Sequence, residues 1–155
     1  MVSVPAMPDT EAPEINSWVS HLQKLVGEPD ENTYFVGHSI GCQTIMRYLE
    51  GLRSKKVGGA VFVAGWFYLE NLEEEEKSIA NPWLETPIDF EKVKSATNNF
   101  KVILSDNDPY GAVDKNKKLF EENLGAKVIV EHNKGHFGGG DGIMELPSAL
   151  NALMG

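Results

Sequence analysis

The sequence contains one cysteine, Cys42, among its 155 residues. A lone cysteine cannot form an intrachain disulfide, which is typical of a reducing compartment, so we expect a cytoplasmic protein. Cys42 lies on an apolar helical stripe, which favours a buried structural thiol over a nucleophile. The sequence lacks an apolar run of the roughly 20 residues that a membrane span needs. Its first residues have neither the basic start nor the long apolar stretch of a signal peptide.

Basic residues are few in this sequence. Lysine and arginine total 14 against 23 aspartates and glutamates, which gives a formal net charge of −9. No basic cluster interleaves with aromatic residues, so neither nucleic acid nor a membrane surface is an expected partner. The acidic run Glu73–Glu76 predicts a solvated helix face, with an interaction patch as the alternative.

Motifs for cofactors and metals are also missing. The sequence has no Gly-x-Gly-x-x-Gly fingerprint and no phosphate-binding loop. His132 and His136 have a spacing that some metal ligands share, but they fall at a strand end and in a loop rather than on one helix face. The glycine-rich stretch 138–142 is a single copy, whereas calcium-binding repeats occur in series. We therefore expect no metal and no cofactor.

Short apolar runs alternate with stretches of helical spacing along the chain. The runs predict five strands, at Val2–Val4, 33–36, 60–64, 102–104 and 127–131. Helices are expected between them, with one or two short ones in an irregular excursion over 66–100. Strands buried on both faces and separated by helices form a parallel sheet. We predict a single α/β domain, residues 1–155, with three α/β/α layers and a mostly parallel sheet of about five strands.

The strand at 33–36 leads into Gly37-His38-Ser39-Ile40-Gly41 and then a helical stripe. A Gly-x-Ser-x-Gly pattern between a strand and a helix predicts a nucleophile elbow, a sharp turn that raises the serine hydroxyl above the sheet. Glycines are expected two residues to either side of Ser39 because bulky side chains there would clash. The helix start aims the Ile40 N–H at the site as an oxyanion donor. The alternative is a tight turn in which Ser39 only caps the helix.

A nucleophilic serine needs a histidine base and a carboxylate, which follow it in the order Ser, acid, His in α/β-hydrolases. Asp106 and Asp108 follow the strand at 102–104, and His136 follows the strand at 127–131. In parallel sheets ligands bind at these carboxyl ends. We favour Asp108 as the acid, because it lies far enough into its loop to bend back toward the histidine loop. Asp106, or either aspartate, could instead be a turn residue.

Aromatic residues gather at the same edge of the predicted sheet. His38 lies inside the elbow, Trp66 and Phe67 follow the strand at 60–64, and Tyr110 is close to Asp108. These four side chains are expected to line a substrate pocket. The alternative is that the aromatic ones pack the 66–100 excursion onto the sheet.

The motif residues together resemble a known family, the small serine hydrolases typified by retinoblastoma-binding protein nine and its bacterial relatives. The matching segments run in order along nearly the whole chain: Asn32–Cys42, Ala60–Trp66, Ser105–Pro109 and Gly135–Phe137. The resemblance implies a compact α/β-hydrolase fold with little or no lid. It also implies Ser39 as nucleophile, Asp108 as acid and His136 as base.

The chain departs from that family in two places. Tyr110–Val113 replaces the usual apolar residue and proline after the acid loop. The family also begins with a strand, a glycine-containing oxyanion loop and a long helix, and this sequence has no such segment before Met1. We expect either that Val2–Val4 pairs directly with 33–36 or that two chains associate and cover the gap. We further expect slow turnover, since the missing loop supplies the second oxyanion donor.

These observations predict a serine hydrolase that acts on small esters or related acyl compounds. Its expected partners are a small-molecule acyl substrate and a second copy of the chain that covers the sheet gap. The alternative is a catalytically weak binding or regulatory protein on a hydrolase fold.

Overall fold

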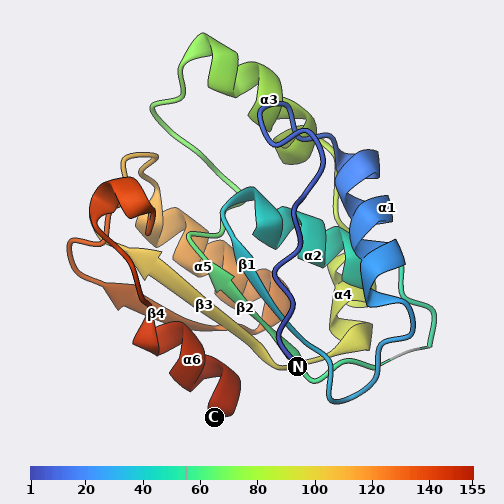
Figure 1. Cartoon of the computed structure of the whole chain (residues 1–155). Coiled ribbons are helices and arrows are strands. Elements are labelled where there is room, and N and C mark those ends of the chain that lie inside the picture. Colours follow the sequence, from blue (N-terminus) through green and yellow to red (C-terminus); the bar gives the residue numbers. More distant parts are fainter. Residues whose placement is uncertain (55) are drawn as a thin grey trace.

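Four apolar runs form one parallel sheet in the computed structural model, which describes residues 1–54 and 56–155 (Figure 1). In sheet order the strands are β1 (Tyr34–His38), β2 (Gly59–Val63), β3 (Phe100–Ser105) and β4 (Lys127–Glu131). All neighbouring strands pair in parallel. β2 and β3 are buried along almost their whole length, whereas the edge strands β1 and β4 are partly exposed. These four strands lie where the apolar runs at 33–36, 60–64, 102–104 and 127–131 predict them.

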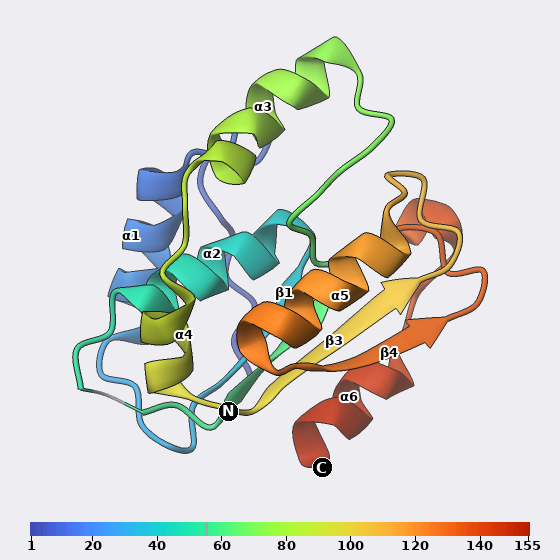
Figure 2. The ribbon, with the colours of Figure 1, turned by 180° about the vertical axis from the view of Figure 1, so that it is seen from behind.

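Helices cover both faces of the sheet, which confirms the three-layer prediction (Figure 2). On one face lie α2 (Ile40–Glu50) and α5 (Val113–Leu124), with α4 (Phe90–Ala96) packed against both. The other face carries α6 (Pro147–Met154), which packs on β2 and β3, while α1 (Ile15–Val26) packs against α2. None of the helices in the described residues is both long and apolar enough to cross a membrane.

The predicted strand at Val2–Val4 is wrong. Residues 1–7 have no regular structure, and the side chains of Val2 and Val4 are 92% and 91% exposed. Pro5 and Pro8 interrupt the segment, and a proline has no N–H to donate to a strand ladder. The described part of the chain therefore has a sheet of four strands rather than about five.

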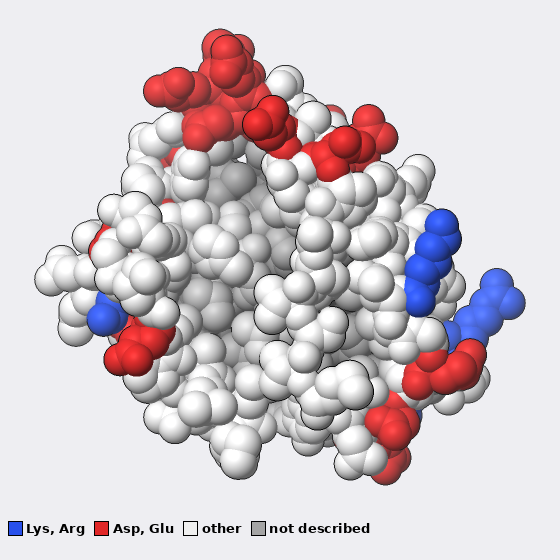
Figure 3. All heavy atoms as spheres, viewed as in Figure 1, with Lys and Arg blue, Asp and Glu red and all other residues white. Residues whose placement is uncertain are grey.

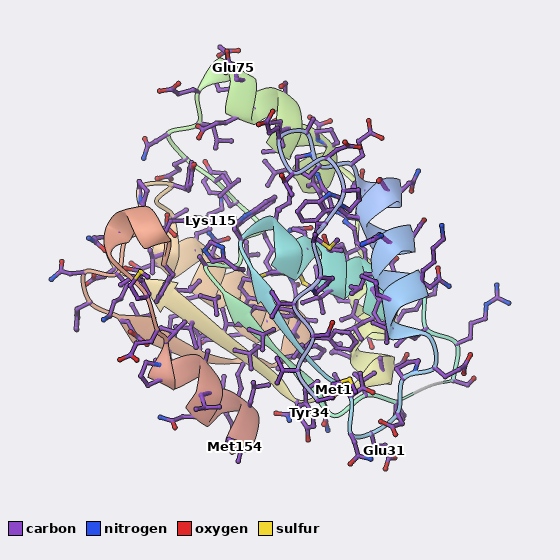
Figure 4. The ribbon with its side chains drawn as sticks, in the orientation of Figure 1. Met1, Glu31, Tyr34, Glu75, Lys115 and Met154 are labelled. Atoms are coloured by element: carbon purple, nitrogen blue, oxygen red, sulfur yellow. The ribbon has the colours of Figure 1, made fainter. Side chains whose placement is uncertain are left out.

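A groove of about 650 Å³ lies between residues 1–5 and β1. Met1 and Tyr34 both line it, and Figure 4 shows their labelled side chains at the same end of the molecule. Tyr34 and Val36 are 48% and 51% exposed. Among the described residues β1 pairs only with β2, so its outer edge has no strand partner there. This groove runs along the edge of the sheet that leads into Ser39.

The 66–100 excursion contains α3 (Glu74–Glu85) and α4. α3 is tied to α2 by the buried side chain of Arg47, whose Nη2 donates to the carbonyl oxygens of Trp83 and Thr86 at 2.8 Å each. Three glutamates of the acidic run, residues 73–75, are exposed, as expected for a solvated helix face.

Cys42 is fully buried in α2, and its Sγ donates to the carbonyl oxygen of Val63 at 3.5 Å. Burial raises the pKa of this thiol, which keeps it protonated and unreactive. The prediction of a structural thiol is therefore confirmed.

We propose that two chains associate through the groove beside β1, because an uncovered apolar edge strand is a template for pairing. Val36→Lys places a charge on this strand and should shift the protein toward a monomer in size-exclusion chromatography with light scattering. Val130→Lys on β4, the opposite edge strand, is the matched control, since Val130 is also partly exposed at 36%. A wild-type chain that stays monomeric at high concentration would contradict the proposal.

Candidate active site

Ser39 lies between the last residue of β1 and the first residue of α2. Its backbone has φ 52° and ψ −120°, a conformation that non-glycine residues rarely adopt and that costs on the order of 1–3 kcal/mol. The Ser39 N–H donates to the carbonyl oxygen of Val63 at 2.9 Å, which fixes the turn against β2. The turn therefore has the sharp strand-to-helix geometry that the motif predicts.

Only one of the two elbow glycines is required by close packing. A Cβ on Gly37 would lie 2.8 Å from Cδ1 of Ile45 and 2.9 Å from the backbone nitrogen of Cys42. A Cβ on Gly41 would meet nothing within 4 Å. The expected clash is thus confirmed at Gly37, whereas a Cβ has room at Gly41, which lines the groove beside β1.

His136 contacts both candidate partners. Its Nε2 lies 2.8 Å from Oγ of Ser39, and its Nδ1 lies 2.8 Å from Oδ2 of Asp108. An ionised carboxylate can only accept, so Nδ1 donates to Asp108 and Nε2 accepts from the Ser39 hydroxyl. The side chains of His136 and Asp108 are 18% and 12% exposed, so water only partly screens their interaction.

The loop after β3 holds the loop after β4 through a series of hydrogen bonds. Three successive backbone N–H groups donate to side-chain oxygens of the acid loop: Asn133 to Asp106, Lys134 to Ser105 and Gly135 to Asn107. The distances are 2.8–3.0 Å. We call this set the loop clamp. By holding the main chain of residues 133–135, the loop clamp places His136 beside Asp108.

Asp106 takes a different partner from Asp108. Its carboxylate accepts from the Asn133 N–H and contacts Nδ1 of His132. Both contacts lower the pKa of Asp106, and the Asn133 N–H has the larger effect. Asp106 therefore belongs to the loop clamp, and Asp108 is the aspartate beside His136. His132 and His136 contact different carboxylates, and among the described residues no three His, Cys, Asp or Glu side chains gather as metal ligands would.

A cavity of about 270 Å³ opens over Ser39. Three of the four predicted pocket residues line it, namely His38, Trp66 and Tyr110. Nε1 of Trp66 lies 3.4 Å from Oγ of Ser39, and the Tyr110 ring meets the His136 ring edge-on with centroids 4.9 Å apart. His38 Nε2 donates to the carbonyl oxygen of His136 at 2.6 Å, which ties the elbow to the histidine loop.

Phe67 is not among the residues that line this cavity, so the prediction for Phe67 is wrong. Its ring packs against Phe120 and Phe90, with centroids 4.4 and 5.4 Å away. Phe67 follows Trp66 directly in the chain, but its ring packs toward α4 and α5, which carry Phe90 and Phe120. The alternative weighed for the aromatic residues, packing of the excursion onto the core, applies to Phe67.

Two buried polar residues that the sequence analysis missed hold the segment around Trp66. Nε2 of Gln43 donates to the carbonyl oxygen of Trp66 at 2.7 Å. Oδ1 of Asn116 accepts from the Phe67 and Tyr68 N–H groups at 2.8 and 3.0 Å. Their signal was a polar residue at helical spacing from buried apolar residues, as Asn116 is from Phe120, since such groups are buried only with partners.

Ile40 is the first residue of α2. The first N–H groups of a helix have no intrahelical acceptor and lie at the positive end of the helix dipole. Ile40 also lines the cavity over Ser39.

Comparisons with known proteins show which family and which fold the chain resembles. A family model described as serine hydrolase matches residues 4–154. The Bacillus subtilis protein YdeN, whose name assigns it to the hydrolases, is 29% identical over 148 residues, covering 95% of this chain and 75% of YdeN. The crystal structure of the ydeN gene product has a TM-score of 0.84 at 26% identity and covers 97% of this chain and 78% of its own. A structure reported with carboxylesterases of the thaumarchaeon Nitrososphaera gargenis shares the fold, with a TM-score of 0.63 at 14% identity over 94% of this chain and 72% of its own.

The two elbow glycines should differ in their tolerance of alanine. Gly37→Ala forces a methyl group onto backbone atoms and should lower the free energy of unfolding by about 1–3 kcal/mol. Gly41→Ala adds a methyl group in open space inside a helix and should raise it by up to about 1 kcal/mol. Urea unfolding followed by circular dichroism measures both. Equal effects at the two positions would contradict the packing described for the elbow.

Proposed function

The chain belongs to the serine hydrolase family, and we propose on that basis that it hydrolyses small esters or related acyl compounds through Ser39, His136 and Asp108. The observation that carries the proposal is the position of His136, which contacts Ser39 through one ring nitrogen and Asp108 through the other. This arrangement gives a serine a base and gives the base a fixed tautomer.

In the proposed reaction, Oγ of Ser39 attacks the carbonyl carbon of the ester while Nε2 of His136 takes the hydroxyl proton. Asp108 stabilises the imidazolium and keeps Nδ1 protonated. The Ile40 N–H donates to the oxyanion of the tetrahedral intermediate. His136 then protonates the departing alcohol oxygen, and a water molecule, deprotonated by His136, releases the acid and restores Ser39.

The cavity supports a small, largely apolar acyl group. Its volume of about 270 Å³ is at the lower end of ligand pockets, and its walls carry apolar side chains including Leu69, Leu72 and Ile79. Carboxylesterase-like activity on short acyl chains follows from this size and lining. Labelling of the intact protein with a fluorophosphonate probe tests the proposal directly, since a serine activated by its base gains one adduct and Ser39→Ala gains none.

Ser39→Ala and His136→Ala should each reduce kcat/KM for a p-nitrophenyl ester by several orders of magnitude, on the order of 10⁴–10⁶-fold. The double variant should lose little more, because members of a triad act as a unit. Steady-state kinetics of the three variants checks this expectation. Losses that multiply in the double variant would mean that the two residues act separately.

The two aspartates should separate sharply in the same assay. Asp108→Asn removes the carboxylate that selects the histidine tautomer and should cost on the order of 10³–10⁴-fold in kcat. Asp106→Asn retains an oxygen that can accept from the Asn133 N–H and should stay within about tenfold of the wild type. A crippling Asp106→Asn beside a mild Asp108→Asn would show that the acid has been assigned to the wrong residue.

A further inference from the structure

The cavity over Ser39 has one carboxylate in its wall. Among the described residues that line it, Glu76 of α3 is the only acidic side chain, and no lysine or arginine accompanies it. The remaining lining is apolar or aromatic apart from Ser39 and two histidines. Any substrate group that enters the cavity beyond the reacting carbonyl therefore meets mainly apolar surface, the two histidines and a single acidic group.

Glu76 is held in place by two donors. The Tyr110 hydroxyl donates to its Oε1 at 2.8 Å, and the Glu73 N–H donates to its Oε2 at 2.9 Å. Both bonds favour the ionised form, and the Glu73 backbone N–H is the larger influence that lowers the pKa of Glu76. The hydrogen bond to Glu76 raises the pKa of Tyr110 to about 12, so Tyr110 stays a neutral donor at physiological pH. Glu76 is thus an oriented negative charge at the cavity wall.

The charge of Glu76 is reinforced by its neighbours on α3. Figure 3 shows acidic side chains gathered over this helix. Lys77 directly follows the acidic run, and its Nζ is paired with Glu74 at 2.6 Å. Like charges close together on one side of a small cavity sum to a negative local potential, which repels anions and accepts neutral groups.

We propose that Glu76 is a specificity-determining residue that excludes acyl groups bearing a negative charge, so that the substrates are esters of neutral, apolar acids. The inference rests on the proposed hydrolase function of the same cavity. An acyl chain ending in a methyl group is compatible with the apolar lining, whereas one ending in a carboxylate is repelled by Glu76 and meets no lysine or arginine among the described lining residues.

A pair of esters with acyl chains of equal length tests the proposal. p-Nitrophenyl hexanoate and mono-p-nitrophenyl adipate differ in the terminal group, a methyl in the first and a carboxylate in the second. The wild type should prefer hexanoate by at least about tenfold in kcat/KM. Glu76→Gln, which keeps the side-chain shape and an oxygen for Tyr110, should reduce that preference by about fivefold to tenfold, the effect of removing one like charge at close range.

Glu75→Gln is the matched control. It removes the same charge from the same helix, but Glu75 is exposed and points away from the body of the molecule at the end of α3 (Figure 4). Its effect on the preference should be below about twofold, since water and salt screen an exposed charge. An equal shift in both variants would mean that the diffuse charge of α3 acts, and would overturn the assignment to Glu76.

A salt titration tests the same idea without any substitution. Raising the ionic strength from about 0.05 to 0.5 M shortens the Debye length and should lower the wild-type preference for hexanoate, with a smaller effect in Glu76→Gln. Hydrolysis of hexanoate with an unchanged preference in Glu76→Gln overturns this inference but leaves the hydrolase function standing. No hydrolysis of either ester by the wild type, with no fluorophosphonate adduct on Ser39, overturns both.

Discussion

The position of His136 depends on the hydrogen bonds that join the loop after β3 to the loop after β4. The loop clamp uses main-chain N–H groups of residues 133–135 as donors, so it fixes the path of the backbone that leads to His136. Its acceptors begin at Ser105, a fully buried residue at the end of β3. The buried end of β3 therefore positions the loop after β4 relative to the sheet. The contact with Asp108 then orients the His136 ring toward Ser39.

Features encoded over a few consecutive residues were predictable from the sequence. The elbow around Ser39 combines a strand, a sharp turn and a helix within one short window, and each has its own local signal. The order in which Ser39, Asp108 and His136 follow their strands placed all three at one sheet edge, because parallel strands share their carboxyl ends. Asp106 and Asp108 were harder to separate, since they are two residues apart and only the fold of the loop decides which faces His136.

Features that depend on distant partners were predicted poorly. Val2–Val4 has the composition of a strand, but a strand exists only where a neighbour pairs with it, and none of the described residues does so. Phe67 and Trp66 are adjacent and both aromatic, yet one packs in the core and the other lines the cavity. Arg47 and Asn116 read as ordinary polar positions on helices, although each is buried and binds main-chain groups of the 66–100 excursion.

Ser39 follows β1 and His136 follows β4, which are the two opposite edges of the sheet. Their 2.8 Å contact therefore joins the loops that follow the two edge strands, which lie about 14 Å apart at the usual strand spacing. The distance between Nε2 of His136 and Oγ of Ser39 therefore depends on the twist of the sheet, because a small rotation between β2 and β3 produces larger displacements at the edge strands. Core substitutions far from the cavity that leave the protein folded can thus change the distance between His136 and Ser39 and lower the reactivity of Ser39. The reactivity of Ser39 is therefore a measure of how well the four strands keep their arrangement.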